Sequence, residues 1–166
     1  MRGKIFRNFI FCFVVFIILS IQVSNVFAIL GVNPDILLLL VILHSIYYGE
    51  YKGEIFGFII GLLEDVLSGT LFGINAFILT LIAWLTSIYK KYVFVSDAIA
   101  FIIYIVLATI FKYILYIIFH LIFSKSNYLD WFYLLKMAGE IFYNSVIGLL
   151  FFYLAPILLK RDENPY

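Results

Sequence analysis

Long apolar stretches separated by short polar segments run through the whole chain. A helix that rises 1.5 Å per residue needs about 20 mostly apolar residues to cross the roughly 30 Å hydrocarbon core of a bilayer. Most of the stretches approach or exceed that length, and the second is rather short. We therefore predict six membrane-spanning helices, at about residues 6–30, 35–49, 53–67, 71–89, 97–123 and 131–159.

The composition favours a protein dissolved in lipid over a soluble domain. Of the 166 residues, 66% are hydrophobic and 13% are charged, and the mean hydropathy is +1.14. A soluble chain of this size needs a charged shell, whereas a chain in lipid can turn apolar side chains outward without cost. The expected fold class is all-α: a polytopic bundle that forms one transmembrane domain over residues 1–166.

The positions of lysine and arginine predict the orientation, because cytoplasmic loops of membrane proteins are enriched in both. With six spans and a cytoplasmic N-terminus, eight basic residues fall on the cytoplasmic side and one, Lys125, falls outside. Lys112 and Lys136 lie within the predicted spans. Both ends of the chain are therefore expected in the cytoplasm.

The first apolar stretch also fits a cleaved signal peptide, since Val26, Phe27 and Ala28 offer the residue spacing that a signal peptidase accepts. Its length and the spans after it favour a retained helix. Cleavage would leave the rest of the topology unchanged.

Two acidic residues, Glu64 and Asp65, lie at the outer end of the third predicted span, and two glycines follow them in the sequence. Gly69 and Gly73 can adopt positive φ, which permits a tight turn before the fourth span. We expect Asp65 to hold this turn by accepting hydrogen bonds from backbone groups or from the Asn75 amide, and so to shape a surface for a partner or ligand. An ordinary interfacial turn with solvated acids is an equally good interpretation.

Glycines recur every four residues in the third span, at positions 53, 57 and 61. This spacing puts small residues on one helical face, where a neighbouring backbone can approach closely. Ahead of the second span, Pro34 suits a first helical turn and Asn33 can cap it.

Charged residues inside spans need partners, because a lone charge in a bilayer is costly. Lys136 and Glu140 are four residues apart, so a mutual ion pair is the simplest expectation. Lys112 has no acid at that spacing and needs a partner from another helix. Glu64 and Asp65 are the candidates by charge, while snorkelling or a contact with another subunit stays open.

No residue pattern predicts catalysis or a bound cofactor. Cys12 is the single cysteine, and His44 and His120 are isolated on apolar segments, so we expect no metal site. No phosphate-binding loop, zinc-protease helix or nucleophile elbow is present. With a net charge of +1, the chain offers no basic patch for nucleic acid.

One segment carries a family resemblance. Its features, in order, are Asn33-Pro34-Asp35 before a Leu-rich helix, Gly57 and Gly61, Leu62-Leu63-Glu64-Asp65, Ser68-Gly69, and Leu71-Phe72-Gly73-Ile74-Asn75-Ala76. This order resembles the MreD family of bacterial rod shape-determining membrane proteins. The specific motif is confined to residues 33–76.

The resemblance implies a non-enzymatic component of the cell-elongation machinery in the bacterial plasma membrane. Such a protein takes part in controlling cell shape and peptidoglycan synthesis. Its direct partner would be MreC, with MreB, RodA and a class B penicillin-binding protein associated indirectly.

The resemblance also implies which residues matter. The family's characteristic turn would be formed by Asp65, Ser68, Gly69, Gly73 and Asn75. Further structural or partner-binding candidates are Pro34, Asp35, Gly57, Gly61 and Glu64. The intramembrane charges Lys112, Lys136 and Glu140 have no family motif behind them.

MreD proteins are thought similar in fold to the substrate-binding subunits of energy-coupling-factor vitamin transporters. Such a subunit is therefore the alternative function. Its pocket would use outer-side polar residues such as Asp65, Asn75, Asn127 and Asp130.

Overall fold

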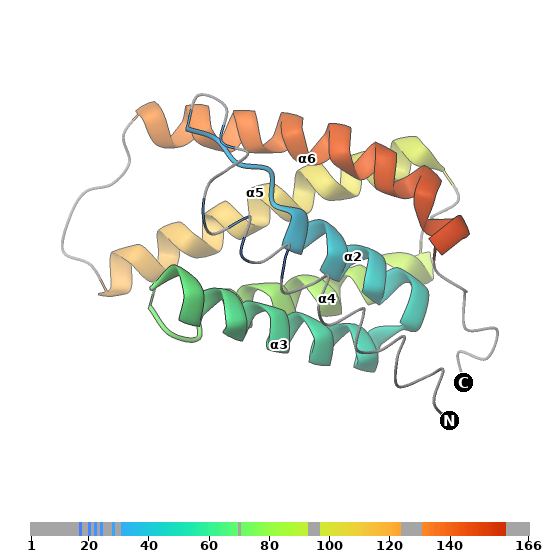
Figure 1. Cartoon of the computed structure of the whole chain (residues 1–166), viewed down its shortest axis with the longest axis horizontal. Helices are drawn as coiled ribbons and strands as arrows, with labels where there is room; N and C mark the ends of the chain where they lie inside the picture. Colours follow the sequence, from blue (N-terminus) through green and yellow to red (C-terminus); the bar gives the residue numbers. More distant parts are fainter. Residues whose placement is uncertain are drawn as a thin grey trace.

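A computed structural model describes residues 31–69, 71–92, 97–123 and 131–158, together with Ile17, Ser20, Gln22, Ser24 and Ala28. These residues form five α-helices (Figure 1). The helices are α2 (Ile36–Tyr48), α3 (Glu50–Ser68), α4 (Ile74–Tyr92), α5 (Ala98–Phe123) and α6 (Trp131–Leu158). The first predicted span, residues 6–30, lies largely outside the described residues.

The five later apolar stretches are confirmed as helices, with small shifts of their ends. The fourth helix begins at Ile74 rather than at residue 71, because residues 71–73 belong to the turn before it. By length and composition, two helices in the described part of the chain could cross a membrane, Ala98–Phe123 and Trp131–Leu154. Over the residues that the structure describes, the chain is thus helical with two candidate spans, and six spans remain a prediction.

Helix α2 lies at the centre of the bundle. Figure 1 shows α3 and α4 running alongside each other below it and α6 above it, with α5 behind. Leu37, Leu38 and Leu39 are fully buried, as are Val41 and Ile42. A helix that is apolar on all sides is one that the surrounding helices enclose, which explains why this short segment has no polar face.

Gly57 and Gly61 of α3 pack directly on the backbone of α4, while Gly53 lies against Ser45 of α2. A Cβ atom added to Gly57 would lie 2.7 Å from the Leu79 carbonyl oxygen, and one added to Gly61 would lie 2.5 Å from the Ala76 Cα. The predicted close approach at these glycines is therefore confirmed. On α3, Phe58 and Ile59 are about half exposed, as side chains that face lipid would be.

The start of α2 corrects one expectation from the sequence. Asp35, and not Asn33, caps the helix, because its carboxylate accepts a hydrogen bond from the Leu38 backbone N–H at 2.9 Å. The helix begins at Ile36, so Asn33 lies too far ahead of the first turn to reach its free N–H groups. Pro34 directly precedes the cap rather than starting the helix.

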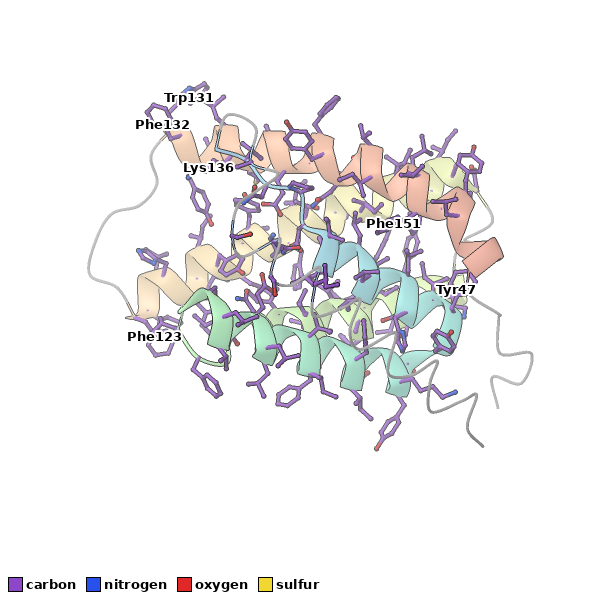
Figure 2. All side chains as sticks on the ribbon, viewed as in Figure 1. Tyr47, Phe123, Trp131, Phe132, Lys136 and Phe151 are labelled. Carbon is purple, nitrogen blue, oxygen red and sulfur yellow. The ribbon has the colours of Figure 1, made fainter. Side chains whose placement is uncertain are left out.

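Large exposed aromatic side chains gather at one end of the bundle. Phe123 at the end of α5 and Trp131 and Phe132 at the start of α6 are all more than 60% exposed, and Figure 2 shows them at the same end. Aromatic rings are enriched at membrane interfaces, where one side is apolar and the other is wet.

Candidate functional site

The turn between α3 and α4 is organised by the carboxylate of Asp65, which is 2% exposed. One carboxylate oxygen accepts the backbone N–H groups of Gly73, at 2.9 Å, and Ala76, at 3.2 Å. The other accepts the N–H of Asn75 at 3.0 Å. The first N–H groups of a helix have no partner inside it, so a residue of α3 satisfies the start of α4.

This hydrogen bonding is the one expected from the sequence, through backbone N–H groups. Gly69 (φ 65°) and Gly73 (φ 96°) both take left-handed conformations, which glycine adopts without steric cost. The Ser68 hydroxyl donates to the Glu64 carbonyl oxygen at 2.7 Å, within its own helix. The Asn75 side chain connects the turn to α5, because its oxygen accepts a hydrogen bond from the Tyr116 hydroxyl.

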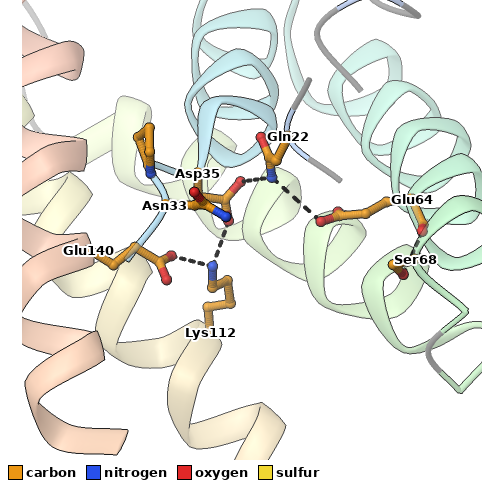
Figure 3. A pocket seen from close by; sticks show the side chains of 8 residues that line it. Gln22, Asn33, Asp35, Glu64, Ser68, Lys112 and Glu140 are labelled. Atoms are coloured by element: carbon orange, nitrogen blue, oxygen red, sulfur yellow. Dashed lines mark hydrogen bonds and ion pairs between the residues drawn. The ribbon is translucent and has the colours of Figure 1, made fainter. Parts of the chain in front are cut away.

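A buried ion cluster lies beside this turn (Figure 3). The Lys112 ammonium on α5 donates to the Asp35 carboxylate at 2.6 Å and also to the Glu140 carboxylate on α6. Each of the three residues is less than 9% exposed. One cation thus joins the start of α2 to α5 and α6.

Two expectations about these charges were wrong. The partners of Lys112 are Asp35 and Glu140, not Glu64 or Asp65, because α5 and α6 lie beside the start of α2. Glu140 does not pair with Lys136, since its carboxylate faces α5 and accepts from Lys112 and from the Tyr113 hydroxyl at 2.7 Å. Lys136 lies on an exposed face of α6, where its ammonium can reach water or the interface.

Two further polar residues, Asn144 and Thr109, complete the cluster and were missed. The Asp35 backbone N–H donates to the Asn144 side-chain oxygen at 2.8 Å, and the Asn144 amide donates to the Thr109 hydroxyl at 3.1 Å. Both residues are fully buried. A signal was available, because Asn144 follows Glu140 by four residues and Thr109 precedes Lys112 by three, which puts each pair on one helical face.

A cavity of about 300 Å³ opens next to the ion cluster. Its lining residues are Gln22, Asn33, Pro34, Asp35, Glu64, Ser68, Lys112 and Glu140. The Gln22 amide bridges two walls, donating to Asp35 at 3.1 Å and to Glu64 at 3.5 Å. Polar groups from five separate segments therefore converge on one space in a chain that is mostly apolar.

The residues singled out from the sequence fall into three places. Pro34, Asp35, Glu64, Ser68, Lys112 and Glu140 line the cavity, whereas Asp65, Gly69, Gly73 and Asn75 make the turn beside it. Gly57 and Gly61 lie in the contact between α3 and α4. Asn127 and Asp130 lie outside the described residues.

His44 has a packing role in the structure. The His44 ring stacks on that of Phe56, with centroids 4.2 Å apart. In the described part of the chain, no group of three His, Cys, Asp or Glu side chains is arranged to hold a metal ion.

The comparisons with known proteins extend the resemblance beyond the turn. The model of a family described as rod shape-determining protein MreD matches residues 2–161. No curated protein and no solved structure matches the chain. Because the match takes in all five described helices and not only residues 33–76, the chain belongs to the MreD family of rod shape-determining proteins.

Proposed function

We propose that the chain is a non-enzymatic component of the bacterial cell-elongation complex and that it acts by binding MreC. Membership of a rod shape-determining family over residues 2–161 carries this proposal. Through MreC, the chain associates indirectly with MreB, RodA and a class B penicillin-binding protein. Its effect is on cell shape and on where peptidoglycan is made.

In this proposal the chain crosses the plasma membrane six times, with both ends in the cytoplasm. The basic residues support this orientation, because eight lie in the predicted cytoplasmic segments and one lies in an outer loop. The turn between α3 and α4 then lies at the outer face, as does the start of α6. The aromatic side chains of Trp131 and Phe132 suit that interfacial position.

The turn between α3 and α4 is the surface that we propose for MreC. Leu71 and Phe72 are 54% and 72% exposed there, while Asp65 fixes the backbone beside them through three hydrogen bonds. Apolar side chains on a rigid backbone lose little entropy when a partner covers them. A single membrane-spanning helix that emerges beside the turn could make that contact.

The experiment is co-purification from the native membrane. A tagged full-length copy is extracted in mild detergent, and MreC is quantified by mass spectrometry relative to the tagged chain. Asp65→Lys replaces the acceptor of three backbone N–H groups by a cation, so we expect MreC recovery to fall roughly tenfold or more, which corresponds to about 1.4 kcal/mol.

Two further variants separate loss of contact from loss of fold. Glu54→Lys reverses a charge on the same helix away from the turn and should retain MreC. Phe72→Ser removes an exposed side chain without touching the Asp65 hydrogen bonds and should reduce MreC recovery while the protein elutes normally on size exclusion. Unchanged MreC recovery with both Asp65→Lys and Phe72→Ser would contradict the proposed interface.

A vitamin-binding transporter subunit is a second candidate, and the polar cavity favours it. Small-molecule sites are concave, with a few convergent polar groups, and start at about 300 Å³. The same purification discriminates the two functions, because a transporter subunit would bring down ATPases and a coupling subunit in place of MreC and wall synthases.

A further inference from the structure

The charges around the cavity are unequal. Its lining includes three carboxylates, those of Asp35, Glu64 and Glu140, and one ammonium group, that of Lys112. Lys112 bonds to Asp35 and Glu140, which leaves the third carboxylate without a cation among the residues that line this space. If all four groups are ionised, the lining carries a formal charge of −2.

Glu64 is the carboxylate that the cluster does not neutralise. Figure 3 shows it on α3, reaching toward Gln22 across the space from Lys112 and Glu140. Among the described residues, its carboxylate accepts a hydrogen bond from the Gln22 amide at 3.5 Å, and that amide also donates to Asp35 at the shorter distance of 3.1 Å. A carboxylate inside a membrane protein is costly unless a cation or several donors satisfy it.

We infer that the cavity is a binding site for a ligand with a primary ammonium group, which pairs with Glu64 across from the Lys112 cluster. An ammonium group supplies the positive charge that the lining lacks and donates three hydrogen bonds. The side-chain oxygens of Asn33 and Ser68, which also line the cavity, are further acceptors. The inference does not depend on MreC binding and goes beyond the proposed function.

The size of the cavity limits the ligand. About 300 Å³ is at the small end of ligand pockets and corresponds to roughly ten water molecules at about 30 Å³ each. A compact amine or the headgroup of an amino-phospholipid has suitable dimensions. Divalent cations suit the site less, because they require several carboxylate or carbonyl oxygens at fixed short distances.

The experiment uses the full-length chain in nanodiscs of phosphatidylcholine and phosphatidylglycerol, which carry no primary amine. Ethanolamine is titrated at pH 7 and constant ionic strength, and the melting temperature and binding isotherm are recorded. Ethylene glycol and sodium chloride are the matched probes, since the first lacks the charge and the second lacks the N–H groups. We expect ethanolamine alone to raise the melting temperature.

The variants assign the effect to Glu64. Glu64→Gln should weaken ethanolamine binding about tenfold to a hundredfold, the range for hydrogen bonds to a charged group. Glu64→Asp keeps the charge and should still prefer ethanolamine to ethylene glycol. This variant tests the inference even if Glu64→Gln misfolds. Glu54→Gln makes the same substitution elsewhere on α3 and should behave as the unaltered chain.

A second arm distinguishes the source of the amine. Phosphatidylethanolamine replacing phosphatidylcholine in the nanodisc should raise the melting temperature and weaken ethanolamine binding if the ligand is a lipid headgroup. With a free amine as ligand, ethanolamine binding is the same in both discs. Equal shifts with ethylene glycol or sodium chloride, or unchanged ethanolamine binding by Glu64→Gln, would overturn the inference and leave Glu64 as a protonated acid.

Discussion

Lys112 holds three segments of the bundle together through one ammonium group. Its carboxylate partners come from the residue before α2 and from α6, and all three side chains are buried. Burying an ion pair gains little net stability, but removing one partner leaves a charge unpaired in a low-dielectric interior. The cluster therefore fixes which helices meet.

The first prediction concerns this residue. Lys112→Met should lower the free energy of unfolding by about 3–5 kcal/mol, because Asp35 and Glu140 both lose their cation. Thermal or urea unfolding in detergent measures this change in the free energy of unfolding. Lys136→Met, which removes an exposed lysine from the next helix, should change stability by no more than about 0.5 kcal/mol. Similar losses for the two variants would mean that the buried pairing is incorrect.

Predictability at the residue scale depended on whether the partners were close in sequence. The role of Asp65 could be predicted, because the N–H groups that donate to its carboxylate lie within eleven residues and glycines mark the turn. The partners of Lys112 could not, since Asp35 is 77 residues away and Glu140 is 28 away. Hydropathy identifies helices but does not say which of them are neighbours.

At the scale of elements, α3 and α4 pack backbone against backbone. Gly61 lies against the Cα and N atoms of Ala76, both 2.5 Å from where a Cβ would be. Backbone atoms cannot move aside as a side-chain end can. The two helices must separate if this position gains a methyl group.

The second prediction compares a glycine that lies against backbone atoms with one that lies against a side chain. Gly61→Ala should destabilise the chain by about 1–3 kcal/mol, as expected for overpacking, and the measurement is again unfolding in detergent. Gly139→Ala is the control, because its Cβ would meet Val32 side-chain carbons at 3.1 Å and 3.2 Å, which can shift. A helical alanine gains up to about 1 kcal/mol in propensity. A larger loss of stability for Gly139→Ala than for Gly61→Ala would contradict the close backbone packing of α3 on α4.

The helix bounds show what the apolar pattern can predict. The stretches at residues 97–123 and 131–159 correspond closely to α5 and α6. The start of α4 was placed three residues early, because Leu71 and Phe72 are apolar but belong to the turn. Apolarity alone does not separate a helix from an exposed apolar turn.

For the whole molecule, the third prediction is the orientation in the membrane. Tyr51, near the start of α3, and Phe72, in the turn that follows α3, are 77% and 72% exposed. In a Cys12→Ser background, Phe72→Cys should react with a membrane-impermeant maleimide added outside spheroplasts, and Tyr51→Cys only after lysis. Labelling of both positions from outside, or the reverse pattern, would exclude the six-span topology with both ends inside.

The most direct measurement of the central claim is cell shape after the chain is depleted from the bacterium that makes it. If the chain serves cell elongation, depleted cells should widen and become round, and a plasmid copy should restore rods while one with Asp65→Lys should not. Depleted cells that keep an unchanged width and length would contradict the account.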